Sequence, residues 1–340
     1  LASERETTVV LVARPEQASL KEAARTQSEL AELNIKNLRL VVNAVYEPGF
    51  TEDPVAVAFS KVVSLGLASI PASLAALPRS LVPMLPGNVV GIEALRLLLR
   101  PSNGEVHPVD VPALDAGSHF EEFVQGIASE GHGVVMTMGK GGVGKTTVAV
   151  RIAKELVRAG HSVLLTTTDP AGNVMDLVGD SDSHLEVARI DAAHEVAEYT
   201  KAALAKAAET MDEEGLALLK EDLRSPCTEE IAVFRAFAET VAQGQDRFVV
   251  IDTAPTGHTI LLMDATEAYH REVARTQSDA PQSVKLLLPR LRDPGFTKVV
   301  LVTLPEPTPV HEAMRLESDL KRAGIEAYGW VVNRSFAEAG

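Results

Sequence analysis

The sequence predicts an α/β fold in which a mostly parallel sheet is covered by helices on both faces. Three observations support it. Short apolar segments without polar alternation are separated by long stretches rich in Ala, Glu, Lys and Leu. A glycine-rich loop stands between one such apolar segment and a helical pattern. A strand–helix–strand pattern occurs twice, near opposite ends of the 340 residues.

The repeated pattern comes first along the chain. Residues 7–43 align without gaps with residues 297–333, and 16 of these 37 positions are identical. Average composition would give roughly two or three identities. The apolar ends of each copy predict strands and the middle predicts a helix. The first copy continues through an apolar segment at 81–86 and a helix near 92–99.

Apolar segments in the second part of the chain predict its strands. Because these segments do not alternate, we expect strands buried on both faces. Residues 195–219 predict a long helical stretch between two of them. The predicted strands are 134–138, 162–166, 248–251, 299–303 and 330–332.

The glycine-rich loop follows the first of these strands and matches the phosphate-binding pattern. Glycines let backbone N–H groups approach phosphate oxygens, and the following helix adds partial positive charge. Lys145 would reach the β- and γ-phosphates, and the Thr146 hydroxyl would ligate Mg²⁺. Lys140 either crosses a dimer or pseudo-dimer interface to a facing nucleotide or is a solvated loop lysine. The predicted nucleotide-binding loop is Gly139, Lys140, Gly141, Gly142, Val143, Gly144, Lys145, Thr146 and Thr147.

Two aspartates follow predicted strands. Asp252 stands where nucleotide-hydrolysing folds place the carboxylate that holds Mg²⁺. Asp169 is suited to holding the metal's water shell or orienting the attacking water. A turn or capping carboxylate is the alternative for each. With the loop, they predict ATP and Mg²⁺ as ligands and Lys140, Lys145 and Asp169 as catalytic residues.

The two copies and the single glycine loop predict the domain organisation. A loop of this type precedes the second copy, whereas none precedes the first within this sequence. The simplest interpretation is part of a tandem of two ATPase halves. Residues 1–100 would be the C-terminal part of the first half, 101–130 a linker and lead-in, and 131–340 the second half without its C-terminal end.

Composition excludes several function classes. The net charge of −15 argues against a nucleic-acid-binding surface. A single cysteine excludes an internal disulfide framework and indicates a reducing compartment. No apolar run reaches the roughly 18 residues that span a bilayer. We therefore expect a soluble, cytoplasmic protein.

Several segments together resemble the arsenical pump-driving ATPases, and the resemblance covers essentially the whole chain. They are the loop, residues 168–171 (Thr-Asp-Pro-Ala), 223–231 (Leu-Arg-Ser-Pro-Cys-Thr-Glu-Glu-Ile), 252–259 (Asp-Thr-Ala-Pro-Thr-Gly-His-Thr) and 261–272. The family is a tandem of two ATPase halves. The resemblance implies a P-loop fold with a deviant Walker A loop, arranged as an intramolecular pseudo-dimer when full length.

The resemblance also implies a metalloid site. The family binds As(III) or Sb(III) between its halves, and Cys227, His258 and Ser225 match the ligand positions of the second half. A thiolate suits trivalent arsenic because that ion is soft. The cysteine ligands of the first half would lie upstream of Leu1. Asn333 resembles the adenine-reading asparagine, whose amide donates to and accepts from the base, and Asn43 is its equivalent in the first copy.

The implied function is ATP hydrolysis coupled to arsenite or antimonite efflux, with the metalloid as activator and transported ligand. The implied partner is an integral membrane channel or antiporter subunit, at the inner face of the plasma membrane, and an arsenite metallochaperone is a second candidate. Two alternatives stay open. One is a tail-anchored-protein targeting ATPase, although this chain lacks paired cysteines. The other is an inactive piece of the pump ATPase.

Overall fold

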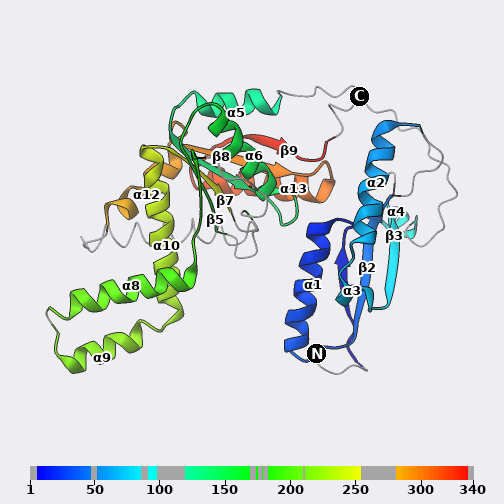
Figure 1. Ribbon diagram of the computed structural model, residues 1–340. Coiled ribbons are helices and arrows are strands. Elements are labelled where there is room, and N and C mark those ends of the chain that lie inside the picture. Colours follow the sequence, from blue (N-terminus) through cyan, green and yellow to red (C-terminus); the bar gives the residue numbers. More distant parts are fainter. Residues whose placement is uncertain are drawn as a thin grey trace. The chain divides into compact units, whose positions relative to one another are not determined.

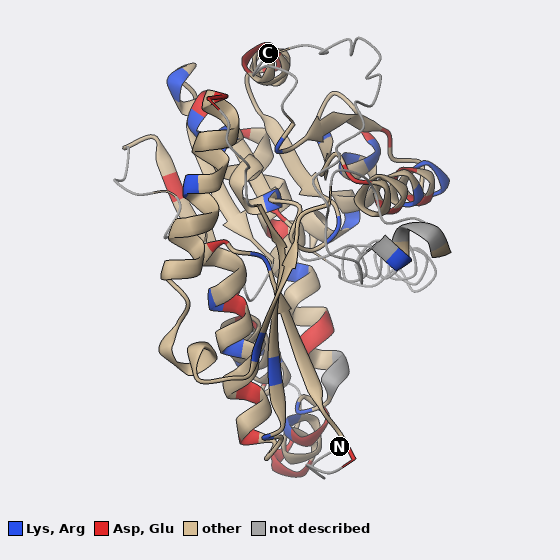
Figure 2. Cartoon of the chain, turned by 90° about the vertical axis from the view of Figure 1, so that its right-hand side faces the viewer, with Lys and Arg blue, Asp and Glu red and all other residues tan. Residues whose placement is uncertain are grey.

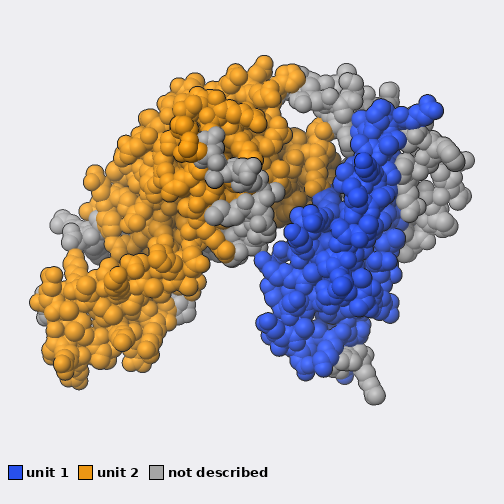
Figure 3. All heavy atoms as spheres, viewed as in Figure 1, with its two compact units in different colours: residues 1–114, 339–340 blue, residues 115–338 orange. Residues whose placement is uncertain are grey.

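The computed structural model describes residues 6–46, 52–85, 91–97, 119–168, 174, 178, 183–209, 211–253 and 281–335. The chain divides into two compact units, drawn in separate colours in Figure 3. Unit 1 comprises residues 1–114 with 339–340, and unit 2 comprises residues 115–338. The predicted α/β fold with parallel sheets is confirmed in both units.

Unit 2 is built on a six-stranded sheet in the order β6-β5-β7-β4-β8-β9, and every neighbouring pair is parallel. Strands β4, β5, β7 and β8 are buried along their whole lengths, as continuous apolar segments predict. The strands are β4 (Gly133–Met138), β5 (Val163–Thr167), β6 (Leu185–Arg189), β7 (Phe248–Asp252), β8 (Thr297–Thr303) and β9 (Ala327–Val332).

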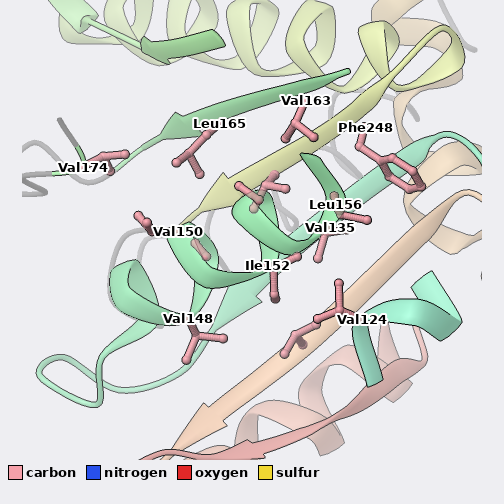
Figure 4. Packing of buried hydrophobic residues seen from close by; sticks show 14 of the residues in the cluster. Val124, Val135, Val148, Val150, Ile152, Leu156, Val163, Leu165, Val174 and Phe248 are labelled. Atoms are coloured by element: carbon pink, nitrogen blue, oxygen red, sulfur yellow. The ribbon is translucent and has the colours of Figure 1, made fainter. Parts of the chain in front are cut away.

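Helices cover both faces of this sheet (Figure 1). Because successive strand residues point to opposite faces, Val135 and Met136 of β4 belong to different core clusters. One cluster packs the strands against α5 and α6, and Figure 4 shows Val124, Ile152 and Leu156 directed at them. The other packs them against α10, α12 and α13. The helices are α5 (Phe120–Ala128), α6 (Lys145–Arg158), α8 (Ala192–Ala207), α9 (Glu213–Asp222), α10 (Pro226–Ala242), the 3-10 helix η1 (Gln243–Gln245), α12 (Gln282–Arg292) and α13 (Pro307–Arg322).

Unit 1 holds a three-stranded parallel sheet in the order β1-β2-β3. Leu20 of α1 packs with Leu11 and Leu40 of the strands in the core of this unit. The elements are β1 (Val9–Ala13), α1 (Gln17–Glu32), β2 (Leu38–Val45), α2 (Pro54–Ala68), α3 (Ala72–Ala75), β3 (Arg79–Pro83) and α4 (Ile92–Leu97).

The structure differs from the sequence-based expectation between β5 and β7. The expected helical stretch at 195–219 is two helices, because Asp212 starts a new helix by accepting a hydrogen bond from the Gly215 N–H at 2.9 Å. Strand β6 was not predicted. Asp191 caps α8, and the hydrogen bond from the His194 backbone N–H lowers the pKa of its carboxyl group.

Charged residues lie mainly on the helices, whereas most of the strand residues are uncharged (Figure 2). Acidic and basic side chains pair locally, as Arg25 does with Glu22 and Glu29 on α1. None of the helices in the described residues has the length and apolarity needed to cross a bilayer.

Candidate active site

The candidate site lies at the carboxyl ends of the central strands of unit 2. Strand β4 has β7 on one side and β8 on the other, so the chain leaves it towards β5 and β7 and later returns to its opposite side. In parallel sheets, such a reversal of strand order leaves an opening at the carboxyl ends. The loop of residues 139–144 leaves β4 at this point and leads into α6.

Two glycines of the loop are required by close contacts. Gly139 has φ 155°, and a Cβ there would lie 2.2 Å from the Val302 carbonyl oxygen. Gly144 has φ 91°, and a Cβ there would lie 2.3 Å from Nδ2 of Asn333. Gly142 also has a positive φ, and a Cβ there would meet no described residue within 4 Å. The loop therefore lies against β8 and the end of β9, while none of the described residues covers its tip at Gly142.

Helix α6 begins at Lys145 directly after this loop. Its first backbone N–H groups have no partners within the helix, and the helix dipole adds partial positive charge there. Lys145 is buried, with 6% of its surface exposed, and its Nζ donates to the Lys140 carbonyl oxygen at 3.2 Å. The ammonium group is thus held within the loop rather than in solvent, as phosphate binding requires.

The Thr146 hydroxyl and the Asp252 carboxylate meet beside the loop. Thr146 Oγ1 donates to Asp252 Oδ2 at 2.7 Å, and Thr167 Oγ1 donates to the same oxygen at 3.4 Å. Asp252 is 1% exposed and pairs in register with Thr137 of β4 and Thr167 of β5. A hydroxyl and a carboxylate oxygen in contact are the hard donors that Mg²⁺ prefers. The residues present therefore fit a magnesium ion next to a bound polyphosphate.

Asn333 contacts the loop from the end of β9. Its Nδ2 donates to the Val143 carbonyl oxygen at 2.9 Å, and its backbone N–H donates to the Thr303 carbonyl oxygen at 2.8 Å. Its Oδ1 accepts from the Arg334 N–H at 3.0 Å. This residue, 190 positions from Val143 in sequence, is thus at the site, which its predicted role of reading adenine requires.

The structure does not test the other predicted site residues. Asp169 and His258 lie outside the described residues, as does the side chain of Cys227. Ser225 is at the start of α10, where its Oγ lies 3.3 Å from Thr228 Oγ1. The prediction of a Cys227, His258 and Ser225 metalloid site is therefore untested.

Sequence reasoning missed Thr167. The three threonines at 166–168 precede Asp169, and the sequence pattern assigns a role to that aspartate alone. Thr167 ends β5 beside Asp252, and its hydroxyl supports that carboxylate at 3.4 Å. A polar residue closing an apolar strand was the available signal.

The sequence matches the family described as anion-transporting ATPases over residues 1–100 and 132–289. The chain belongs to the anion-transporting ATPase family. The loop, Asp169, Cys227, Asp252 and His258 all lie in the second matched range, whereas Asn333 lies beyond it.

Two individual proteins are similar to this chain over its whole length. The chain is 45% identical over 348 residues to an arsenical pump-driving ATPase of Escherichia coli. It is also 45% identical over 343 residues to the arsenical pump-driving ATPase of Acidiphilium multivorum. Both alignments cover all of this chain and 58% of the relative, so the chain spans less than two thirds of these proteins' length. The predicted resemblance to arsenical pump-driving ATPases is confirmed.

Proposed function

We propose that unit 2 binds and hydrolyses ATP with Mg²⁺, as one half of an ATPase that powers arsenite or antimonite efflux. The observation that carries the proposal is the contact between Thr146 and Asp252 beside a glycine loop whose tip no described residue covers. Hydrolysis needs a phosphate cradle, a metal site and a placed water. The loop and the Thr146–Asp252 pair supply the first two.

The residues of the site divide the work of ATP binding and hydrolysis. The backbone N–H groups of the loop and the start of α6 hold the phosphate oxygens. Lys145 stabilises charge on the β- and γ-phosphates, and Lys140 reaches a nucleotide across the pseudo-dimer interface. Thr146 and Asp252 hold Mg²⁺, which when bound neutralises developing charge on the phosphates. Asp169 orients the attacking water, and Asn333 recognises the adenine edge.

The metalloid enters as activator and cargo. Cys227, His258 and Ser225 would bind As(III) or Sb(III) as the contribution of this half, with the thiolate as the strongest ligand. Closure of two halves around the metalloid would accelerate hydrolysis. The energy would drive export through a membrane channel or antiporter subunit, with the ATPase peripheral at the inner membrane face and a metallochaperone as the metalloid donor.

The first experiment measures nucleotide binding and turnover separately. Substitution Lys145→Ala should weaken binding of a fluorescent ATP analogue and lower any ATP hydrolysis about 100-fold or more. Lys154→Ala, in the same helix α6, is the matched control and should change neither. Normal hydrolysis by Lys145→Ala would refute the site assignment.

The second experiment separates the proposed function from its alternatives. Antimonite should raise the ATPase rate when the other half of the tandem is present, and Cys227→Ser should abolish that response while leaving nucleotide binding intact. Nucleotide binding without turnover would identify an inactive piece of the pump ATPase. Stimulation by an apolar helical peptide and not by antimonite would favour a tail-anchored-protein targeting ATPase.

A further inference from the structure

The helical pair α8–α9 of unit 2 buries none of its residues, although the two helices have 16 and ten residues. By contrast, seven residues of α6 are buried. Helix α8 packs against α10 and α9 packs against α8, so that α9 lies farther from the sheet (Figure 1). A surface helix of a globular protein normally buries an apolar stripe, so α9 presents a face that the described part of the chain does not cover.

That face includes an open hollow with a volume of about 590 Å³ along α9. Its apolar residues are well exposed, since Met211 is 49% and Leu218 62% exposed. Four of the lining residues recur at helical spacing within α9, and the other two directly precede the helix, so together they form one stripe. They are Met211, Asp212, Gly215, Leu218, Leu219 and Asp222.

The charge around the stripe is mostly negative. Two of the lining residues, Asp212 and Asp222, are acidic and lie near its two ends. Between residues 209 and 222 the chain has six acidic residues and one basic residue. These are Glu209, Asp212, Glu213, Glu214, Glu221 and Asp222 against Lys220. An apolar stripe with an acidic border favours a partner that is apolar along one line and basic beside it.

We propose that the α9 stripe, defined by the six lining residues above, binds a basic amphipathic helix of a protein partner. A straight stripe on one helix fits the apolar side of another helix, whose residues at i, i+3, i+4 and i+7 would enter the hollow. Lysines or arginines flanking those residues would face Asp212, Glu213 and Asp222. An anionic lipid surface is disfavoured because it would repel the same carboxylates.

The stripe lies on a different element from the nucleotide loop, which is at the carboxyl end of β4. The inference goes beyond the proposed function and does not depend on it, because binding can be measured without nucleotide. Failure of ATP hydrolysis and failure of peptide binding are therefore distinguishable.

The test uses the whole chain and a synthetic helical peptide of leucine and lysine with apolar residues at i, i+3, i+4 and i+7. The unsubstituted chain should bind it, and the pair Met211→Ser with Leu218→Ser should weaken binding about tenfold or more. The control pair Met314→Ser with Leu65→Ser removes side chains that are 55% and 60% exposed elsewhere and should leave affinity unchanged. Equal loss in both pairs would overturn the proposal.

Charge is tested by a second matched comparison. Glu213→Gln with Glu214→Gln, in the first turn of α9, should weaken peptide binding and reduce its salt dependence. The control pair Glu121→Gln with Glu122→Gln, in the first turn of α5, removes the same charge elsewhere and should change neither peptide binding nor its salt dependence. A basic helical partner would be refuted if a peptide of leucine and glutamate bound equally well. It would also be refuted if anionic phospholipid vesicles bound and the Met211 and Leu218 substitutions abolished that binding.

Discussion

The strand–helix–strand unit occurs twice in this chain, and the two copies differ in what covers them. Helices α1 and α13 begin and end at residues separated by the same offset of 290 positions. Each follows an extended Glu, at Glu16 and Glu306, whose N–H donates to the carbonyl two residues earlier. Secondary structure is therefore set by the sequence of the unit itself, since both copies adopt it in different surroundings.

Burial is set by the neighbouring elements. Val300 and Val302 of β8 are fully buried in the cluster that includes α6, whereas their equivalents Val10 and Val12 in β1 are 48% and 63% exposed. In unit 2, β8 pairs with β4, and α6 covers that face. In the described part of unit 1, β1 pairs with β2 alone. Identical residues at equivalent positions thus have different exposures because, among the described residues, the second copy lies beside a strand–loop–helix segment and the first does not.

The largest expected effect is a difference in stability between equivalent substitutions in the two copies. Val302→Asp should destabilise unit 2 by about 4 kcal/mol or more, since it buries a charge without a partner. Val12→Asp should change stability by about 0.5 kcal/mol or less because that side chain is exposed. The single tryptophan, Trp330 in β9, reports unfolding of unit 2 by its fluorescence.

Unit 1 has no tryptophan, so the effect of Val12→Asp on the stability of unit 1 is measured by amide hydrogen exchange in α1 and β2. Strand propensity cancels in this comparison, because both substitutions replace Val by Asp at equivalent strand positions. Comparable destabilisation of the two units would contradict the assigned difference in burial. It would mean that the face of β1 bearing Val12 is covered in solution.

The next effect concerns nucleotide binding. Asn333→Ala removes the hydrogen bond to the Val143 carbonyl and should weaken ATP binding about tenfold, the value of one such hydrogen bond. Asn43→Ala makes the equivalent change in the first copy, where Asn43 is exposed, and should not affect binding at the loop of unit 2. Titration calorimetry with ATP measures both. Equal losses in the two variants would show that Asn333 has no special role at the loop.

The difference between buried and exposed strands also explains which strands could be predicted from the sequence. Continuous apolar segments predicted five strands of unit 2, namely β4, β5, β7, β8 and β9. The first four are buried along their whole lengths as expected, whereas β9 has no fully buried residue, so the expected burial of 330–332 on both faces is wrong. Strand β6, with one buried residue, carries no such signal. The roles of Lys145, Thr146 and Asp252 follow from local patterns in which neighbouring residues define the chemistry. The contact of Asn333 with the loop depends on the order of strands in the sheet, which residue spacing does not encode.

The smallest expected effect concerns the turn that ends each repeated helix. Asn34 and Gly324 occupy equivalent positions after α1 and α13, with φ of 61° and 75°. Asn34→Gly should stabilise unit 1 by about 0.5 kcal/mol, because glycine adopts this conformation without strain. Gly324→Asn should destabilise unit 2 by about 1 kcal/mol, since it adds that strain.

A contact in unit 2 makes the second change the larger one. A Cβ at position 324 would lie 3.2 Å from Nε of Arg292, which is held by its 2.7 Å hydrogen bond to the Ala323 carbonyl oxygen. The double variant Gly324→Asn with Arg292→Ala removes that contact, so adding the Asn to the Arg292→Ala background should cost only the conformational strain. If chemical denaturation gave Gly324→Asn the same cost in both backgrounds, Arg292 would not constrain this turn, and the two copies would differ here only in the residue that each uses.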